Sequence, residues 1–134
     1  MQLEQMIADL AGNKSVTPAS QQLSSIAATL HMQIDFEQSP KTIADTLRAI
    51  SLRANKAFAD QEVVMEASEY LSFARHRRHH QTLLSIIAFM IKDADAGNKH
   101  VVFCTLDLFV EALSSHERLE DSTFGRFLTT INIH

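Results

Sequence analysis

Apolar residues recur every three to four positions along most of this 134-residue chain, the spacing of one face of an α-helix. Two such stripes lie at 3–10 and 23–34, the second after Thr17 and Pro18, a capping residue followed by a proline suited to the first helical position. Ser39-Pro40 repeats this start signal before a stripe that reaches Phe58. The first half of the chain is therefore predicted to be helical.

The middle of the chain contains the most apolar segment. Asp60 is the predicted cap of a helix whose apolar stripe runs from Val63 to Ala74. Residues 83–91 are apolar on nearly every side, which predicts a central buried helix at about 81–96 that ends at Gly97-Asn98. The stripes on the two sides of 75–80 differ by about half a turn. We expect a break within 75–80, and one continuous helix over 61–95 is the alternative.

The C-terminal third is ambiguous at one point. The segment Val101–Cys104 has strand propensity, but the apolar residues that follow it continue at helical spacing, and no partner strand is evident. Helix is the favoured interpretation. Asp121-Ser122 is the predicted start of a last short helix. Together the patterns predict an all-α fold, a single compact bundle of six to seven short-to-medium helices, in one domain over 1–134.

Composition supports this fold class. Apolar residues make up 46% and charged residues 21%, a usual globular mixture, and three glycines with two prolines are too few for a sandwich or barrel. The single cysteine, Cys104, fits a reducing compartment. The longest apolar run is about half of the ~20 residues that a membrane span needs, and the N-terminus does not resemble a signal peptide. We expect a soluble, cytoplasmic protein without a membrane role.

A dense basic block stands out in a chain whose net charge is −4. Arginines grip carboxylates and phosphates, and histidines add positive charge as pH falls. We therefore predict a surface for a protein partner, one that is acidic by charge complementarity. Nucleic-acid binding is the alternative, although the net charge disfavours it. The candidate partner-binding residues are Arg75, His76, Arg77, Arg78, His79 and His80.

Metal binding and thiol chemistry give a weaker alternative. His76 and His80 lie one helical turn apart, but the spacing identifies no third ligand, and two arginines between them would repel a cation. Cys104 lies one turn from His100 in a mid-helix setting that lacks free backbone amides. We therefore expect no native metal site, no cofactor and no catalytic residue; a metal- or thiol-dependent enzyme remains the weakest reading.

Most phenylalanines fall on the predicted inward stripes, but Phe36 and Phe73 do not. Together with Phe124 and Phe127 of the short last helix, they could form a homodimer seam or a partner groove. The function predicted from sequence is thus a non-enzymatic helical protein–protein interaction module of the adaptor, inhibitor or regulator type.

Overall fold

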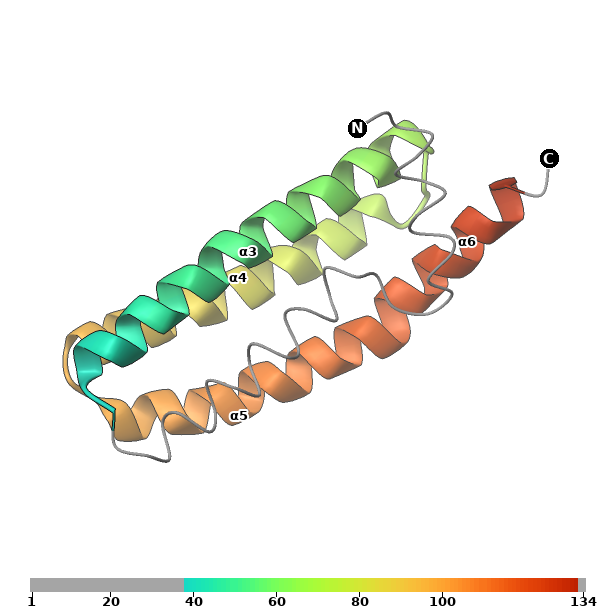
Figure 1. Ribbon diagram of the computed structural model, residues 1–134. Coiled ribbons are helices and arrows are strands. Elements are labelled where there is room, and N and C mark those ends of the chain that lie inside the picture. Colours follow the sequence, from blue (N-terminus) through green and yellow to red (C-terminus); the bar gives the residue numbers. More distant parts are fainter. Residues whose placement is uncertain (1–37, 133–134) are drawn as a thin grey trace.

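The computed structural model describes residues 38–132, to which the structural statements below refer. They form the helices α3 (Pro40–Ala67), α4 (Phe73–Asp95), α5 (Lys99–His116) and α6 (Ser122–Asn132), with the π-helical turn η1 (Glu117–Asp121) between the last two. Residues 38–132 contain no strand, so the all-α prediction is confirmed for this part of the chain. Figure 1 shows α3, α4 and α5 running alternately in opposite directions, while α6 continues the course of α5.

Helix α3 begins where the sequence predicts. The hydroxyl oxygen of Ser39 accepts a hydrogen bond from the Thr42 backbone N–H at 3.1 Å, and Pro40 occupies the first turn. A separate helix capped by Asp60 is wrong, because α3 passes through this residue without interruption. The Asp60 carboxylate instead pairs with Lys56 one turn earlier, at 2.8 Å.

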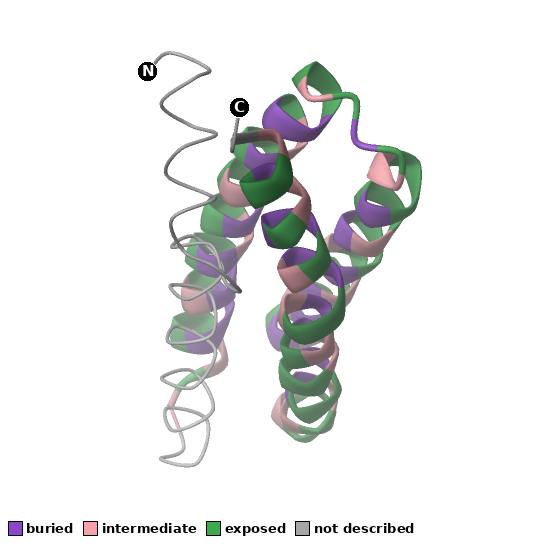
Figure 2. Ribbon diagram, turned by 90° about the vertical axis from the view of Figure 1, so that its right-hand side faces the viewer, coloured by how far each residue is buried: buried purple, intermediate pink, exposed green. Residues whose placement is uncertain are grey.

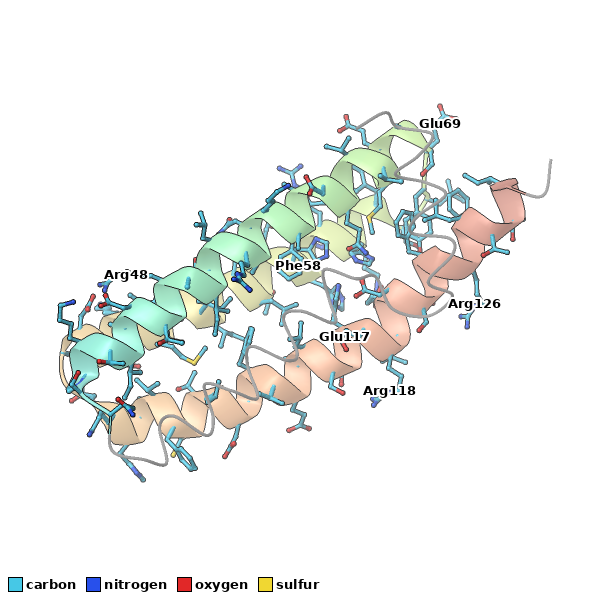
Figure 3. The ribbon with its side chains drawn as sticks, viewed as in Figure 1. Arg48, Phe58, Glu69, Glu117, Arg118 and Arg126 are labelled. Atoms are coloured by element: carbon cyan, nitrogen blue, oxygen red, sulfur yellow. The ribbon has the colours of Figure 1, made fainter. Side chains whose placement is uncertain are left out.

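The turn between α3 and α4 lies at 68–72, earlier than the predicted break. Glu69 adopts a left-handed backbone with φ 56°, and Figure 3 shows it at this turn. The Tyr70 N–H donates to the Met65 carbonyl at 3.0 Å, and the Glu69 N–H to the Glu66 carbonyl at 3.2 Å. These bonds form a Schellman motif, which normally has glycine in the left-handed position. A break within 75–80 and a continuous helix over 61–95 are therefore both wrong.

Helix α4 ends in a second Schellman motif, as the sequence predicts. Gly97 has φ 82°, its N–H donates to the Ala94 carbonyl at 3.0 Å, and the Asn98 N–H donates to the Asp93 carbonyl at 2.9 Å. Lys99 then opens α5, which includes 101–104. The helical interpretation of that segment is confirmed.

The chain runs from α5 through η1 into α6 without a loop. Helix α6 begins at Ser122, where the sequence predicts the last short helix. Asp121 does not cap it, because Asp121 belongs to η1 and the helical backbone continues from η1 into α6. Together with the merging of two predicted helices into α3, this means that the described residues do not support a bundle of six to seven helices. The helices predicted near 3–10 and 23–34 lie outside the described residues.

Buried apolar side chains form two clusters. The larger joins α3, α4 and α5, and the smaller joins the end of α3, the following turn and α6. In Figure 2 the buried positions lie along the facing sides of the helices. The larger cluster consists of Ile43, Ala44, Leu47, Ile50, Ala54, Phe58, Leu83, Ile87, Met90, Ala94, Val102, Leu106, Phe109 and Leu113. The smaller consists of Val64, Met65, Tyr70, Phe124 and Leu128.

Helix α4 is central, but it is not buried on every side. Leu83, Ile87 and Met90 are at most 3% exposed, whereas Phe89 is 63% exposed and Ile91 is half-buried. The reason is that α4 packs on α3 and on α5 and leaves its remaining face uncovered by any other described helix. The prediction of a helix apolar and buried all round is therefore corrected to one with an exposed face.

No helix within residues 38–132 combines the length and the apolar character needed to cross a membrane.

Candidate metal centre

A layer of buried polar side chains separates the two apolar clusters. On α3 it lies between Phe58 and Val64, on α4 it precedes Leu83, and from the end of α5 it reaches into η1 before Phe124. Its members are at most 5% exposed. They are Gln61, His76, His80, His116 and Asp121. Buried ionisable groups of this kind are rare unless they are paired or bind a metal.

Helix geometry explains how these side chains meet. His76 and His80 are one α-helical turn apart, so both face the interior from α4. His116 ends α5 and Asp121 ends η1, five residues later. In this turn the Ser122 N–H donates to the Glu117 carbonyl, the i to i+5 pattern of a π-helix. Such single π turns recur at functional sites, and here the turn keeps a histidine and a carboxylate on the same side.

The side chains converge on one point. The Asp121 Oδ1 atom lies 3.1 Å from the His76 Nε2 atom and 3.0 Å from the His116 Nε2 atom. One potential ligand atom from each of His76, His80, His116 and Asp121 lies within 4.8 Å of all the others. Metal–ligand bonds of about 2.0–2.1 Å in a tetrahedron place ligand atoms about 3.3 Å apart. Small side-chain movements would therefore suffice to enclose an ion.

Several imidazole nitrogens in this layer have no hydrogen-bond partner among the described residues. They are His76 Nδ1, His80 Nε2, His116 Nδ1 and His116 Nε2. The His116 Nε2 atom is close to Asp121, but the contact lacks the direction of a hydrogen bond. Buried polar atoms in folded proteins are nearly always satisfied, by protein, water or an ion. A cation bound by the carboxylate and by one nitrogen of each ring would satisfy part of this set, because each imidazole can offer only one nitrogen to a given ion.

Neighbouring side chains hold the imidazoles in place. His80 Nδ1 lies 2.8 Å from the Glu62 carboxylate, which leaves the buried Nε2 atom facing the layer. Gln61 contacts both His76, at 3.0 Å, and Asp121, at 3.4 Å. Phe58 stacks on the His80 ring with centroids 4.0 Å apart. In metal sites, a histidine commonly binds the ion through one nitrogen and donates a hydrogen bond to an outer-shell carboxylate through the other.

Electrostatics favour the protonation states that a metal requires. Burial lowers the pKa of His80 to about 2, with the neighbouring histidines acting in the same direction, and burial also lowers the pKa of His76. Burial alone would raise the pKa of Asp121, but its contacts with His116 and His76 outweigh burial, so the pKa is lowered. At neutral pH the layer thus presents neutral imidazoles at His76 and His80 and an ionised carboxylate at Asp121.

The structure divides the predicted basic block in two. His76 and His80 are buried in the polar layer and are not available to a partner, because they point away from the surface. Arg75, Arg77 and Arg78 are exposed and His79 is half-buried. Arg75 pairs with Glu120 at 3.0 Å, and the Arg77 Nε atom lies 3.6 Å from Glu62. The residues accessible to a partner are therefore the three arginines and His79.

Of the phenylalanines proposed for a seam, one is core and two are partly buried. Phe124 is 1% exposed, and Phe73 and Phe127 pack against the smaller cluster, where Tyr70 lies 4.9 Å from the rings of both Phe124 and Phe127. Phe36 lies outside the described residues. Phe124 is thus buried within the chain and does not present an exposed dimer contact.

The thiol alternative gains no support from its surroundings. Cys104 is exposed on α5, and its sulfur lies 3.9 Å from the His100 Nε2 atom. Its position in the second turn of a regular helix leaves no free backbone amide beside it.

Sequence reasoning missed His116 and Asp121. The cap interpretation of Asp121 hides its role in the layer, and no feature of the sequence distinguishes His116. Their separation of five residues matches no α-helical face, so only a π turn brings them together. Comparisons with known proteins supply no relative to guide the assignment: no family model, no curated protein and no solved structure matches this chain.

Proposed function

We propose that this protein binds one divalent transition-metal ion, with zinc the best match, through His76, His80, His116 and Asp121. The observation that carries the proposal is the set of buried imidazole nitrogens without partners around a buried carboxylate. An apolar packing role does not account for it, because unpaired buried polar atoms cost stability.

The donor set selects the class of metal. Imidazoles suit zinc, copper, iron and nickel, whereas magnesium and calcium prefer shells made of oxygen atoms. Neutral imidazoles with a single carboxylate leave a divalent ion with a net positive charge. The nearby carboxylates of Glu62 and Glu120 would offset this charge at the edge of the layer.

Four protein ligands complete a tetrahedral shell, so the site is structural or regulatory and not hydrolytic. This keeps the function non-enzymatic. The ligands come from α4, α5 and η1, so a bound ion would tie the α3–α4 hairpin to the C-terminal helices and would add its binding free energy to folding.

The test is a metal titration of the full chain without a histidine tag. Protein treated with a chelator and then dialysed should take up close to one equivalent of zinc, measured by elemental analysis. Cobalt(II), as a spectroscopic substitute, should give the intense visible absorption of a tetrahedral nitrogen and oxygen site. Retention of less than a tenth of an equivalent would contradict the proposal.

Ligand variants make this test specific. His76→Ala, His116→Gln and Asp121→Asn should each lower zinc affinity at least about tenfold, since each removes one ligand or its charge. His79→Ala and His100→Ala are the matched controls, because these histidines lie outside the layer. Equal losses in controls and ligand variants would indicate adventitious binding. Circular dichroism of every variant checks that the helices persist.

A protein-binding role for the exposed part of the basic block is a second proposal. It is favoured by the exposure of Arg77 and Arg78 on consecutive positions of α4. An acidic protein partner suits these arginines, and nucleic acid is the alternative. We also propose that the protein forms a homodimer and is located in the cytoplasm. Replacing both arginines with alanine should weaken partner capture and its salt dependence while leaving the helical content unchanged.

A further inference from the structure

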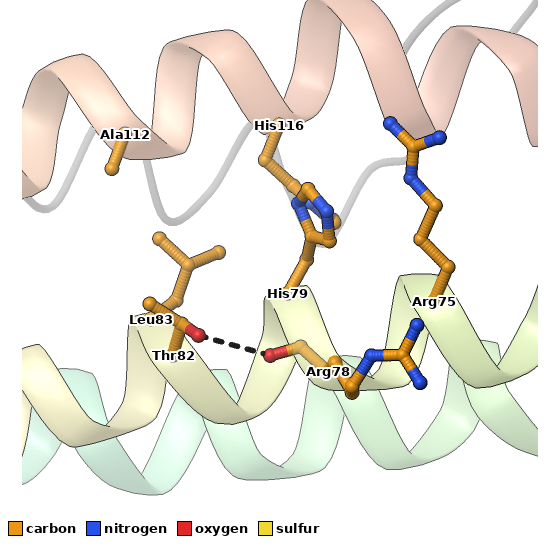
Figure 4. Close-up of a pocket in the computed structure, with 7 residues that line it drawn as sticks. All are labelled: Arg75, Arg78, His79, Thr82, Leu83, Ala112 and His116. Atoms are coloured by element: carbon orange, nitrogen blue, oxygen red, sulfur yellow. Dashed lines mark hydrogen bonds between the residues drawn. The ribbon is translucent and has the colours of Figure 1, made fainter.

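A pocket of about 510 Å³ lies beside the metal centre, between α4 and α5. Figure 4 shows His79 and His116 approaching each other across it, with Arg75 and Arg78 to one side and Leu83 and Ala112 to the other. The residues that line it are Arg75, Arg78, His79, Thr82, Leu83, Ala112 and His116.

The pocket carries positive charge without acidic lining. Arg78 makes no ion pair among the described residues, so its guanidinium donors remain available. Arg75 contacts Glu120 through one nitrogen, at 3.0 Å, which leaves its other donors. Two guanidinium groups at the rim of one pocket suit an oxyanion, because each can donate two parallel hydrogen bonds to a carboxylate or phosphate.

The opposite end of the pocket is apolar. Leu83 belongs to the larger cluster and Ala112 packs against it. The Thr82 hydroxyl donates to the Arg78 carbonyl at 3.1 Å, so its oxygen can still accept a hydrogen bond. A ligand that matches both ends has an anionic head and a short apolar body.

His116 connects the pocket to the metal centre, since it lines the one and is a candidate ligand of the other. A divalent ion behind this ring would raise the positive potential at the pocket. We propose that the pocket binds a small oxyanion, a short-chain carboxylate or a phosphate, through Arg75 and Arg78 beside the bound metal. The metal-dependent part of this inference rests on the proposed function.

The experiment titrates the full chain, zinc-loaded and chelator-treated, with butanoate and with inorganic phosphate, followed by calorimetry and by NMR shifts. Saturable binding is expected, several-fold tighter in the zinc-loaded protein. Arg78→Gln and Arg75→Gln should each weaken it about tenfold, as expected for loss of a charge-assisted hydrogen-bonded pair. Arg53→Gln is the control, because it removes the same charge from an exposed position of α3 outside the pocket.

The outcomes separate the two proposals. Absence of saturable binding to zinc-loaded protein, or equal weakening by Arg53→Gln, would overturn the oxyanion site while leaving the metal centre supported by its zinc content. Arginine-dependent binding by a protein that takes up no zinc would support the pocket and overturn the metal centre. Much tighter binding of a single-stranded oligonucleotide than of phosphate, with the same arginine dependence, would overturn the small-molecule assignment.

Discussion

The carboxylate of Glu62 shows how the setting of one residue defines its role. One oxygen lies 2.8 Å from His80 Nδ1, and the other lies 3.6 Å from the Arg77 side chain. Burial raises the pKa of Glu62, while the charge of Arg77 lowers it in part. An ionised Glu62 orients the His80 ring and makes its Nε2 atom a better ligand.

Replacing Glu62 with glutamine should therefore lower zinc affinity about 10–100-fold, the usual effect of losing an outer-shell carboxylate. Glutamine keeps the size and an acceptor oxygen but removes the charge. The measurement is competition with a chromophoric chelator at fixed pH. Glu66→Gln is the control, since Glu66 is an exposed residue of the same helix. Equal affinities of the Glu62→Gln and wild-type proteins would show that His80 is not oriented in this way.

At the same scale, sequence reasoning reached only half of the centre. The one-turn spacing of His76 and His80 is visible in the sequence, but the two arginines between them predict repulsion of a cation. The structure removes that objection, because Arg77 and Arg78 are exposed while both histidines are buried. Which residues of a helix are buried depends on the direction in which its apolar face points. The incorrect helix boundaries around 60–80 hid that direction for α4.

The helix ends illustrate which boundaries a sequence can predict. Ser39-Pro40 is recognisable as a helix start because serine is a common N-cap and proline suits the first turn. Gly97 is recognisable as a helix end because glycine adopts the left-handed backbone without strain. The end of α3 was missed because the left-handed position holds Glu69, which carries no such signal. The π turn was missed for a similar reason, as its sequence contains no break and the helical course continues through it.

The left-handed residues at the ends of α3 and α4, Glu69 and Gly97, also provide a matched test. Glu69→Gly should raise the free energy of unfolding by about 0.5–1 kcal/mol, because glycine avoids the left-handed strain but adds freedom to the unfolded chain. Gly97→Ala should lower the free energy of unfolding by about 1 kcal/mol, because alanine is strained at φ 82°. A Cβ at this position has nothing within 4 Å, so no steric clash adds to that cost. Urea denaturation of both variants with intact helix content measures the difference. A destabilised Glu69→Gly protein would mean that the Glu69 side chain makes a stabilising interaction that outweighs its backbone strain.

At the scale of the whole molecule, the apolar faces of α3, α4 and the α5–η1 segment are each interrupted by polar residues. These interruptions lie beside one another and form the buried polar layer. This layer divides the core into a larger and a smaller cluster. The all-α class follows from local patterns, which explains why the sequence sufficed for it. The polar layer depends on how α3, α4 and the α5–η1 segment are aligned, and this alignment arises from long-range packing that no local pattern encodes.

The buried layer makes the stability of the metal-free protein depend on pH. His80 has its pKa lowered from 6.5 to about 2, and the pKa of His76 is lowered too. Below about pH 6.5 the unfolded chain therefore binds protons that the folded chain excludes, so stability is lost as pH falls. One pH unit below 6.5, His80 alone should cost about 1.4 kcal/mol, and His76 acts in the same direction.

Urea denaturation in the presence of a chelator, at about pH 7.5 and about pH 5.5, measures this loss, which should exceed the contribution of a single histidine. His80→Gln should reduce the difference between the two pH values, whereas His100→Ala, at an exposed position, should leave it unchanged. Zinc should increase the stability more at the higher pH, because protons compete with the ion for the same imidazoles. Equal stability of the metal-free protein at both pH values would mean that His76 and His80 can be protonated in the folded state, which their burial between the two apolar clusters opposes.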